Sequence, residues 1–189
     1  IPLGIVPVEE DGSVYFEAPV ERELIFQVLD ENYMAVQTMR SVAYVHPGEH
    51  LSCFGCHEDQ YMAIPNLPEL PLALQRPPSK LEPEVSDPVE PVTYYRLVQP
   101  VFETTCVTCH REVGKGPKDM SFEALRPYVT YFSGGMRGDV MLPNTGGSRS
   151  TPGQIGAMGS RMGQALLNET HRAAVPEEAY RRVVLWLDA

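Results

Sequence analysis

Two short motifs carry the clearest chemistry in this sequence. In each, two cysteines are separated by two residues and followed directly by a histidine, at residues 53–57 and 106–110. This spacing lets both thiols reach the two vinyl groups of one porphyrin, while the histidine binds the iron from the proximal side. The sequence therefore predicts two covalently bound haem c groups with their irons, attached through Cys53, Cys56, Cys106 and Cys109 and ligated by His57 and His110.

Other uses of paired cysteines explain the pattern less well. A zinc ribbon uses Cys-x-x-Cys twice, but the interval from Cys56 to Cys106 is much longer than such sites favour, and a ribbon needs no histidine after each pair. A redox dithiol normally occurs once, near a βαβ pattern that is missing from this sequence. Two local disulfides would explain the cysteines but neither histidine. The two motifs use all 4 cysteines of the chain, which favours haem attachment.

The remaining histidines are candidates for the distal side of each iron. There are three, His46, His50 and His171, and each taken alone reads as an ordinary surface residue. His171 is expected in a loop between helices, where the chain can fold back over the haem of the second motif, so it is the first choice as a distal ligand. His46 and His50 precede the first motif too closely to swing over its own haem, but they could reach the other one.

Methionine is the other usual distal ligand of a c-type haem, and the chain has 8. Four of them fall where a small cytochrome places its ligand: Met136, Met141, Met158 and Met162. Met158 and Met162 are four residues apart, as on one face of a helix, and read better as residues that fill gaps in the core. Methionine ligation of one haem therefore stays open as an alternative to histidine.

Composition and charge narrow the class of protein. The chain has 189 residues, 43% of them hydrophobic, with a formal net charge of −10. A surface this acidic disfavours nucleic acid and anionic membranes and suits basic redox partner proteins. No apolar run approaches the roughly 20 residues of a membrane span. Both ends read as cut from a longer chain with its signal peptide upstream. Because haem is joined to these thiols after export, we expect a periplasmic or extracellular protein.

The order of patterns along the chain predicts an α+β fold. Residues 1–50 alternate between apolar and polar side chains at 14–17, 24–29 and 34–45, as in the strands of a small β-sandwich. Residues 51–63 hold the first haem-attachment segment. Residues 64–92 are rich in proline and read either as a disordered linker or as a strap across the surface. Residues 93–189 read as a helical, loop-rich cytochrome domain with the second haem.

Four helices are expected in this last segment. The first covers residues 94–105, with a kink at Pro100, and the second covers 122–132 with Ser121 as its cap. The third covers residues 154–167, although its glycines weaken the pattern. The fourth starts with Pro176 at its first position. Its spacing predicts a buried stripe of Ala179, Val183, Trp186 and Leu187.

Several short blocks of the chain resemble a known family. It is similar to the C-terminal di-haem cytochrome region of proteins related to the hydrazine synthase alpha subunit, which are large secreted chains in which a β-propeller precedes this region. The blocks that carry the resemblance are GSVYF at 12–16, QTMRS at 37–41, YVHPGE at 44–49, CFGCHE at 53–58, GAMGSR at 156–161 and WLD at 186–188.

The resemblance implies an unusual first haem. In hydrazine synthase the motif histidine is drawn to a zinc ion, and a tyrosine four residues later binds the iron; His57 and Tyr61 match these two positions. The second haem of that enzyme has two histidine ligands. The further zinc ligands, and a distal histidine for the second haem, would come from the propeller part, which this chain lacks. Without zinc to hold it aside, the imidazole of His57 should out-compete a phenol that must lose a proton to bind, so we expect His57 on the iron and Tyr61 packed nearby.

Three functions follow from these expectations. The first is electron transfer between redox partners, with both irons saturated by protein ligands. The second is haem catalysis on a small nitrogen or oxygen compound at an iron with an open face, as in hydrazine synthase. The third is a self-assembling cytochrome filament, in which copies of the chain, or further domains of a longer chain, complete the iron sites. Electron transfer is the first choice, because no other catalytic constellation is visible in the sequence.

Overall fold

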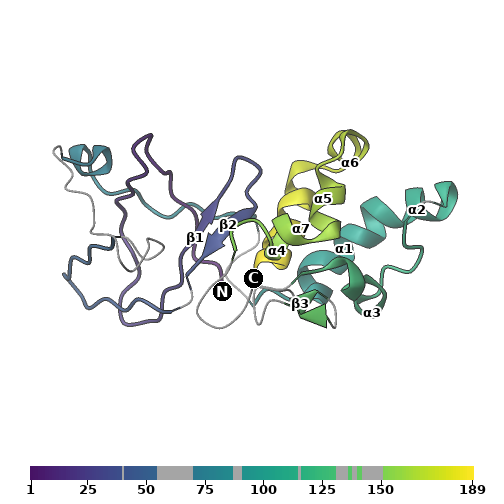
Figure 1. Cartoon of the computed structure of the whole chain (residues 1–189), viewed down its shortest axis with the longest axis horizontal. Coiled ribbons are helices and arrows are strands. Elements are labelled where there is room, and N and C mark those ends of the chain that lie inside the picture. The colour runs from purple at the N-terminus through teal and green to yellow at the C-terminus, as the bar shows by residue number, and fades with distance from the viewer. Residues whose placement is uncertain are drawn as a thin grey trace. The chain divides into compact units, whose positions relative to one another are not determined.

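The computed structural model describes residues 1–39, 41–54, 70–86, 91–114, 116–130, 136–137, 140–141 and 151–189 (Figure 1). The chain divides into two compact units. The helical unit consists of Ile1–Pro2, Ile25–Ser41 and Val85–Ala189, and the looped unit consists of Leu3–Leu24 and Val42–Glu84. Short antiparallel strands precede a mostly helical region, so the predicted α+β class is confirmed. No helix in the described ranges is both long enough and apolar enough to cross a bilayer.

The looped unit is joined by single backbone bridges rather than by continuous strands. Ile5 pairs with Glu82, Phe16 with Ser79, and Leu24 with Ala43. Residues 70–84 of the proline-rich segment thus run beside the start of the chain. Arg76 adds an ion pair there, with its Nε 2.6 Å from a carboxylate oxygen of Glu9.

These pairings are shorter than the sequence pattern at 14–17 predicted, and they do not form a packed sandwich. The segment that lies opposite contains Pro77, Pro78 and Pro83. Proline has no backbone N–H, so it cannot donate to a ladder, and pairing is confined to the residues between.

A short hairpin forms the β part of the helical unit. Strand β1 (Gln27–Leu29) pairs antiparallel with β2 (Ala35–Thr38), with Gln27 opposite Thr38. The side chain of Asp30 closes the turn, because its Oδ1 accepts from the backbone N–H groups of Asn32 at 2.9 Å and Met34 at 2.8 Å. A second hairpin pairs β3 (Met136–Arg137) with β4 (Val140–Met141).

The first predicted helix is a nearly continuous helical run from residue 94 to residue 113 that includes two wide π turns. The N–H of Gln99 bonds the carbonyl of Tyr94, five residues back. Pro100 has no N–H to donate to an ordinary turn, and the wider turn beside it accommodates the proline within the helical run. The run comprises η2 (Tyr94–Val98), α1 (Gln99–Val101), η3 (Phe102–Cys106) and α2 (Val107–Val113).

The other helices are short, apart from the last. The predicted cap at Ser121 is confirmed, since its side chain accepts from the N–H of Ala124 at 3.3 Å. Pro176 lies one residue earlier than expected, at the N-cap of the last helix instead of its first position. These elements are α3 (Phe122–Leu125), η4 (Arg126–Tyr128), α4 (Gly156–Gly159), α5 (Arg161–Leu166), α6 (Glu169–Ala174) and α7 (Glu177–Asp188).

The predicted helix at 154–167 is broken in two at Ser160, where backbones approach closely. A Cβ atom on Gly163 would lie 1.9 Å from the carbonyl oxygen of Ala157, and one on Gly159 would lie 2.1 Å from that of Gln154. Only glycine fits at both positions. Gly163 is therefore required by the packing of α5 against α4, and Gly159 by the close approach of α4 to the backbone of Gln154.

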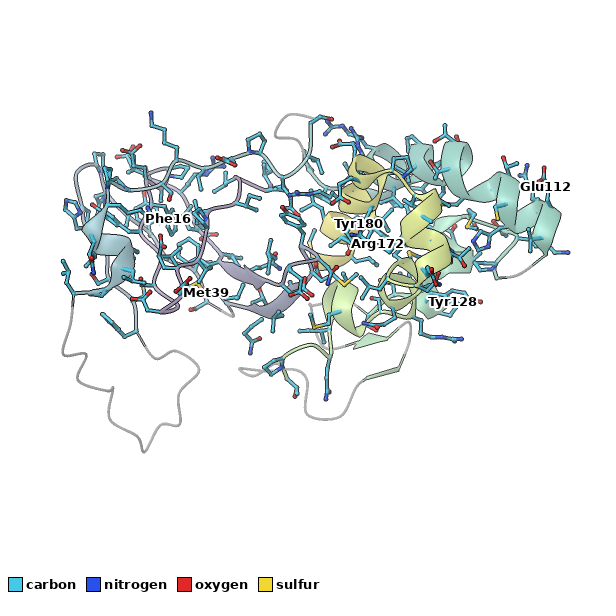
Figure 2. All side chains as sticks on the ribbon, turned by 90° about the horizontal axis from the view of Figure 1, so that it is seen from above. Phe16, Met39, Glu112, Tyr128, Arg172 and Tyr180 are labelled. Atoms are coloured by element: carbon cyan, nitrogen blue, oxygen red, sulfur yellow. The ribbon has the colours of Figure 1, made fainter. Side chains whose placement is uncertain are left out.

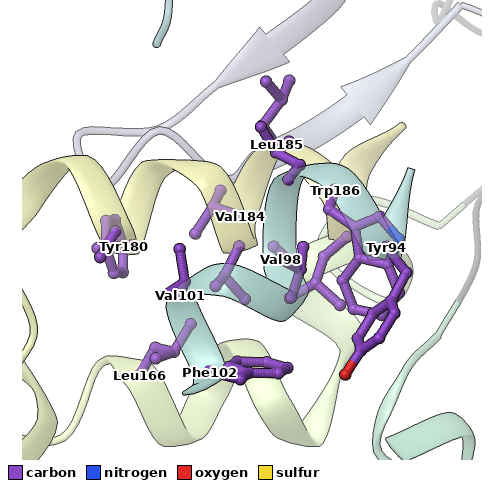
Figure 3. Close-up of a cluster of buried hydrophobic side chains, with 14 of the residues drawn as sticks. Tyr94, Val98, Val101, Phe102, Leu166, Tyr180, Val184, Leu185 and Trp186 are labelled. Atoms are coloured by element: carbon purple, nitrogen blue, oxygen red, sulfur yellow. The ribbon is translucent and has the colours of Figure 1, made fainter. Parts of the chain in front are cut away.

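Helix α7 supplies the centre of the hydrophobic core (Figure 3). Its predicted stripe is confirmed, since all four side chains are buried. The Trp186 indole meets the Tyr94 ring edge-on, with ring centroids 5.5 Å apart, and so ties α7 to the helical run that leads into the second motif. Met158 and Met162 pack against this core, as the sequence predicted.

The carboxylate of Asp188 joins three elements at the end of α7. It is 3% exposed, and it accepts the backbone N–H of Ala35 in β2 at 2.9 Å and that of Ala157 in α4 at 2.6 Å. Its backbone carbonyl accepts from the side-chain amide of Gln27 in β1 at 2.7 Å. One residue thus connects the hairpin, α4 and α7.

We expect Asp188→Asn to destabilise the protein by about 1–3 kcal/mol, because one carboxylate oxygen becomes an NH₂ group that faces a buried N–H donor. The free energy of unfolding in urea measures the loss. Asp119→Asn is the matched control, since Asp119 also accepts a backbone N–H, from Ser121 at 2.8 Å, but at an exposed site. Equal losses in the two variants would show that the buried bonds of Asp188 do not hold these elements together.

Candidate functional site

The second cysteine motif lies on one face of a helix. Cys106 ends η3, and Cys109 and His110 follow in α2, three and four residues later, which is the spacing of neighbours on a helix surface. Gly114 ends the helix in the left-handed conformation with φ of 69°, and its N–H bonds the His110 carbonyl at 3.2 Å. The two thiols and the imidazole therefore share one helical surface, as attachment of a single porphyrin requires.

His171 lies beside this motif. The sequence placed it in a loop, but the structure places it in α6, which Asn168 caps. The ring centroids of His110 and His171 are 6.1 Å apart and the ring planes are inclined by 31°. A metal–imidazole bond is about 2 Å long, so two imidazoles on one metal ion have ring centres about 6 Å apart. The separation fits one iron held between the two rings.

Helix α6 is itself held in place by a cation–π contact. The guanidinium carbon of Arg172 lies 4.5 Å from the ring centroid of Tyr180 in α7 (Figure 2). Tyr180 in turn donates its hydroxyl to the carbonyl of Asn32 at 2.8 Å. Burial raises the pKa of Tyr180 to about 12, so this hydroxyl stays protonated and remains a donor. The position of His171 thus depends on the core and on the turn of the β1–β2 hairpin.

The His110 ring is held by packing. Gly116 lies against it, with φ of 76°, and a Cβ atom there would come within 2.7 Å of Cε1 and 2.9 Å of Nδ1 of the imidazole. Nδ1 is buried and has no hydrogen-bond partner among the described residues. No contact among the described residues explains this orphaned nitrogen, because ligation through Nε2 would leave the Nδ1–H group still without an acceptor.

The pair of histidines is compatible with an iron porphyrin. Two imidazoles on one six-coordinate metal ion would leave four positions, and a porphyrin supplies four nitrogens. Within the described ranges, no three His, Cys, Asp or Glu side chains come together as metal ligands.

The two thiols of this motif differ in environment. Cys106 is partly buried, and this burial, followed by the nearby Cys109, raises the pKa of its thiol to about 11. Cys109 is exposed. The Cys106 thiol is therefore protonated at neutral pH, which disfavours disulfide exchange and metal binding.

The first motif is described only in part. Cys53 is exposed, as is Phe54, whereas Cys56, His57 and Tyr61 lie outside the described residues. Their roles stay predictions.

The two remaining histidines belong to the looped unit and are exposed. His46 meets the Tyr44 ring edge-on, with centroids 5.3 Å apart, and its backbone N–H bonds a carboxylate oxygen of Glu49 at 2.8 Å. Ligation by His46 or His50 also stays a prediction.

An open pocket of about 480 Å³ borders another face of α2. It is lined there by Val107 and Arg111, while Tyr94 and Phe122 contribute from the core. Burial, followed by the charge of Asp119, raises the pKa of Tyr94 to about 12. The pocket is lined by neither the motif cysteines nor the two histidines, so we do not assign it to the haem.

Sequence reasoning missed two residues of this site, Asn168 and Gly116. A cap signal was available for Asn168, because Asn stands three residues before His171 in a helical pattern. No local pattern shows that Gly116 touches His110, since this contact depends on the path of the chain after α2.

Comparison with known proteins gave one family. Residues 2–58 match the model of the hydrazine synthase alpha subunit middle domain. The match covers the expected strand region and ends directly after the first Cys-x-x-Cys-His motif, whereas the resemblance seen in the sequence was to a C-terminal di-haem region. No curated protein and no solved structure matches the chain significantly. Over residues 2–58, this chain is similar to the hydrazine synthase alpha subunit middle domain.

Proposed function

We propose that the chain is a di-haem c-type cytochrome that transfers electrons between redox partner proteins in the periplasm or outside the cell. The observation that carries the proposal is the pair of imidazoles, His110 and His171, at a separation that fits one iron. A haem supplies one-electron redox chemistry when bound. The relation to the hydrazine synthase alpha subunit supports a haem-related or enzyme-associated role at a coarser level.

Two features of the second site favour electron transfer over catalysis there. With imidazoles on both faces, no coordination position remains for a substrate. Cys109 is exposed, so the porphyrin edge bonded to it would lie at the surface, where an electron can pass to a partner. The net charge of −10 suits a partner with a basic surface and an association that weakens with salt.

The exported, matured protein should carry two covalent haems. Acid–acetone extraction should leave the haem on the polypeptide, and the intact mass should exceed that of the bare chain by two haems. Replacing Cys106 and Cys109 together by serine should remove one of them. A mass equal to the bare polypeptide would contradict the proposal, and so would a double variant that still holds two haems.

His171→Ala should convert one low-spin haem to high-spin without loss of either haem, because the second iron loses one imidazole. Absorption and electron paramagnetic resonance spectra measure the change. Thr170→Ala, at an exposed neighbour on α6, is the control and should leave the spectra unchanged. An unaltered spectrum in His171→Ala would show that His171 is not an iron ligand.

Haem catalysis at the first motif is the second candidate. It is favoured by the family match, which names an enzyme subunit and extends through this motif. In that case Tyr61 would bind the iron and one face would stay open.

The two candidates differ in the expected effect of Tyr61→Phe. If His57 binds the iron, as we expect, the spectra of both haems should stay unchanged. Disappearance of a high-spin tyrosinate signal in this variant would instead favour the enzyme. His57→Ala complements the test, because it should alter the first haem only if His57 is a ligand.

A further inference from the structure

The side chain of Asn168 makes two contacts to the same residue. Its Oδ1 accepts the backbone N–H of His171 at 3.0 Å and lies 2.9 Å from the ring nitrogen Nδ1 of that histidine. The backbone N–H can only donate, so the atom it meets must be the amide oxygen. An amide oxygen has no hydrogen to give. The contact at Nδ1 therefore requires that Nδ1 carry the hydrogen.

This assignment determines the state of the other ring nitrogen. A neutral imidazole with hydrogen on Nδ1 has its free lone pair on Nε2, which is the state that can bind a metal ion. Metal-ligating histidines commonly donate their second nitrogen in this way, and the acceptor determines the tautomer and the ring orientation. Asn168 provides such an acceptor beside a ring that lies 6.1 Å from His110, centroid to centroid.

We propose that Asn168 is a positioning residue that selects the Nδ1–H form of His171 and directs its Nε2 to the iron of the haem on Cys106 and Cys109. The inference rests on the proposed function, since it needs His171 as an axial ligand. His110 differs, because its Nδ1 has no acceptor among the described residues and its ring rests on Gly116. The two axial imidazoles are thus held in different ways, one by a hydrogen bond and the other by packing.

If Asn168 positions the His171 ring, its replacement should change the properties of the haem, whereas a residue that only caps α6 should leave them unchanged. An acceptor that binds the Nδ1–H group increases the electron density on the ring. Nε2 then becomes a stronger electron donor to the iron, which stabilises the ferric state. Loss of the acceptor should raise the reduction potential of the second haem, and a stronger acceptor should lower it. Loss of the acceptor should also weaken the binding of His171 to the iron. The imidazole concentration that half-displaces His171 should then fall by about 10- to 100-fold.

Three variants separate capping of α6 from positioning of the ring. Asn168→Asp keeps the cap and replaces the amide oxygen by a carboxylate. Asn168→Ser keeps an oxygen that can cap the helix, but its side chain is too short to reach the ring as well. Asn168→Ala loses both contacts. Ser121→Ala, which removes the cap of α3, is the control for the loss of a cap elsewhere.

The measurements are the reduction potential of the second haem in the mature protein and its half-saturation by imidazole. We expect a lower potential in Asn168→Asp, and a higher potential with easier displacement of His171 in Asn168→Ser and Asn168→Ala. Ser121→Ala should match the wild type. If Asn168→Ser behaves as the wild type, capping alone explains Asn168 and the inference is overturned.

Failure of the inference and failure of the proposed function look different. A His171→Ala variant with unchanged spectra would overturn both, because His171 would then not be a ligand. High-spin conversion in His171→Ala, together with unchanged potentials in all Asn168 variants, would overturn only the role of Asn168. In wild-type ferric protein, the Nδ1 proton of His171 should appear as a hyperfine-shifted exchangeable resonance, and it should exchange faster with solvent in Asn168→Ser.

Discussion

A buried carboxylate at the end of α7 joins the elements on which the rest of the helical unit is built. Asp188 stands at the C-terminal end of its helix, where the helix dipole disfavours a negative charge, and it is withdrawn from water. Both costs are offset by the backbone N–H groups of Ala35 and Ala157, each bound to one carboxylate oxygen. Removal of either donor would leave a partly unpaired buried charge, so these contacts specify how the hairpin and α4 meet α7.

The chemical site inherits its geometry from this arrangement. Trp186 of α7 packs on Tyr94, which begins the helical run that carries the second motif. The ring of Tyr180, in the same helix, contacts the guanidinium of Arg172 in α6, the helix that contains His171. One helix therefore contacts the elements that bear both histidines. A change in the core that shifts α7 would alter the distance between the two imidazoles, even though neither histidine belongs to the core.

At the proposed second haem site, the two histidines would tune one iron from both sides. The ring of His171 donates to Asn168 at the surface, whereas the buried Nδ1 of His110 lies against Gly116 and has no acceptor among the described residues. In the first arrangement, polar side chains can adjust how strongly the imidazole donates electrons to a metal. In the second, contact with the glycine fixes the orientation of the ring.

The sequence by itself predicted the attachment chemistry, because the spacing of two cysteines and a histidine is a local pattern and needs no distant contact. It also determined the α+β class, the cap at Ser121 and the buried stripe of α7, all of which rest on local periodicity. Tertiary structure alone decided that His171 lies beside His110. It also turned the predicted strands of the looped unit into single bridges. These features depend on contacts between residues far apart in the chain. A local sequence pattern does not show which distant segment will lie opposite, or whether that segment has the backbone N–H groups needed for pairing.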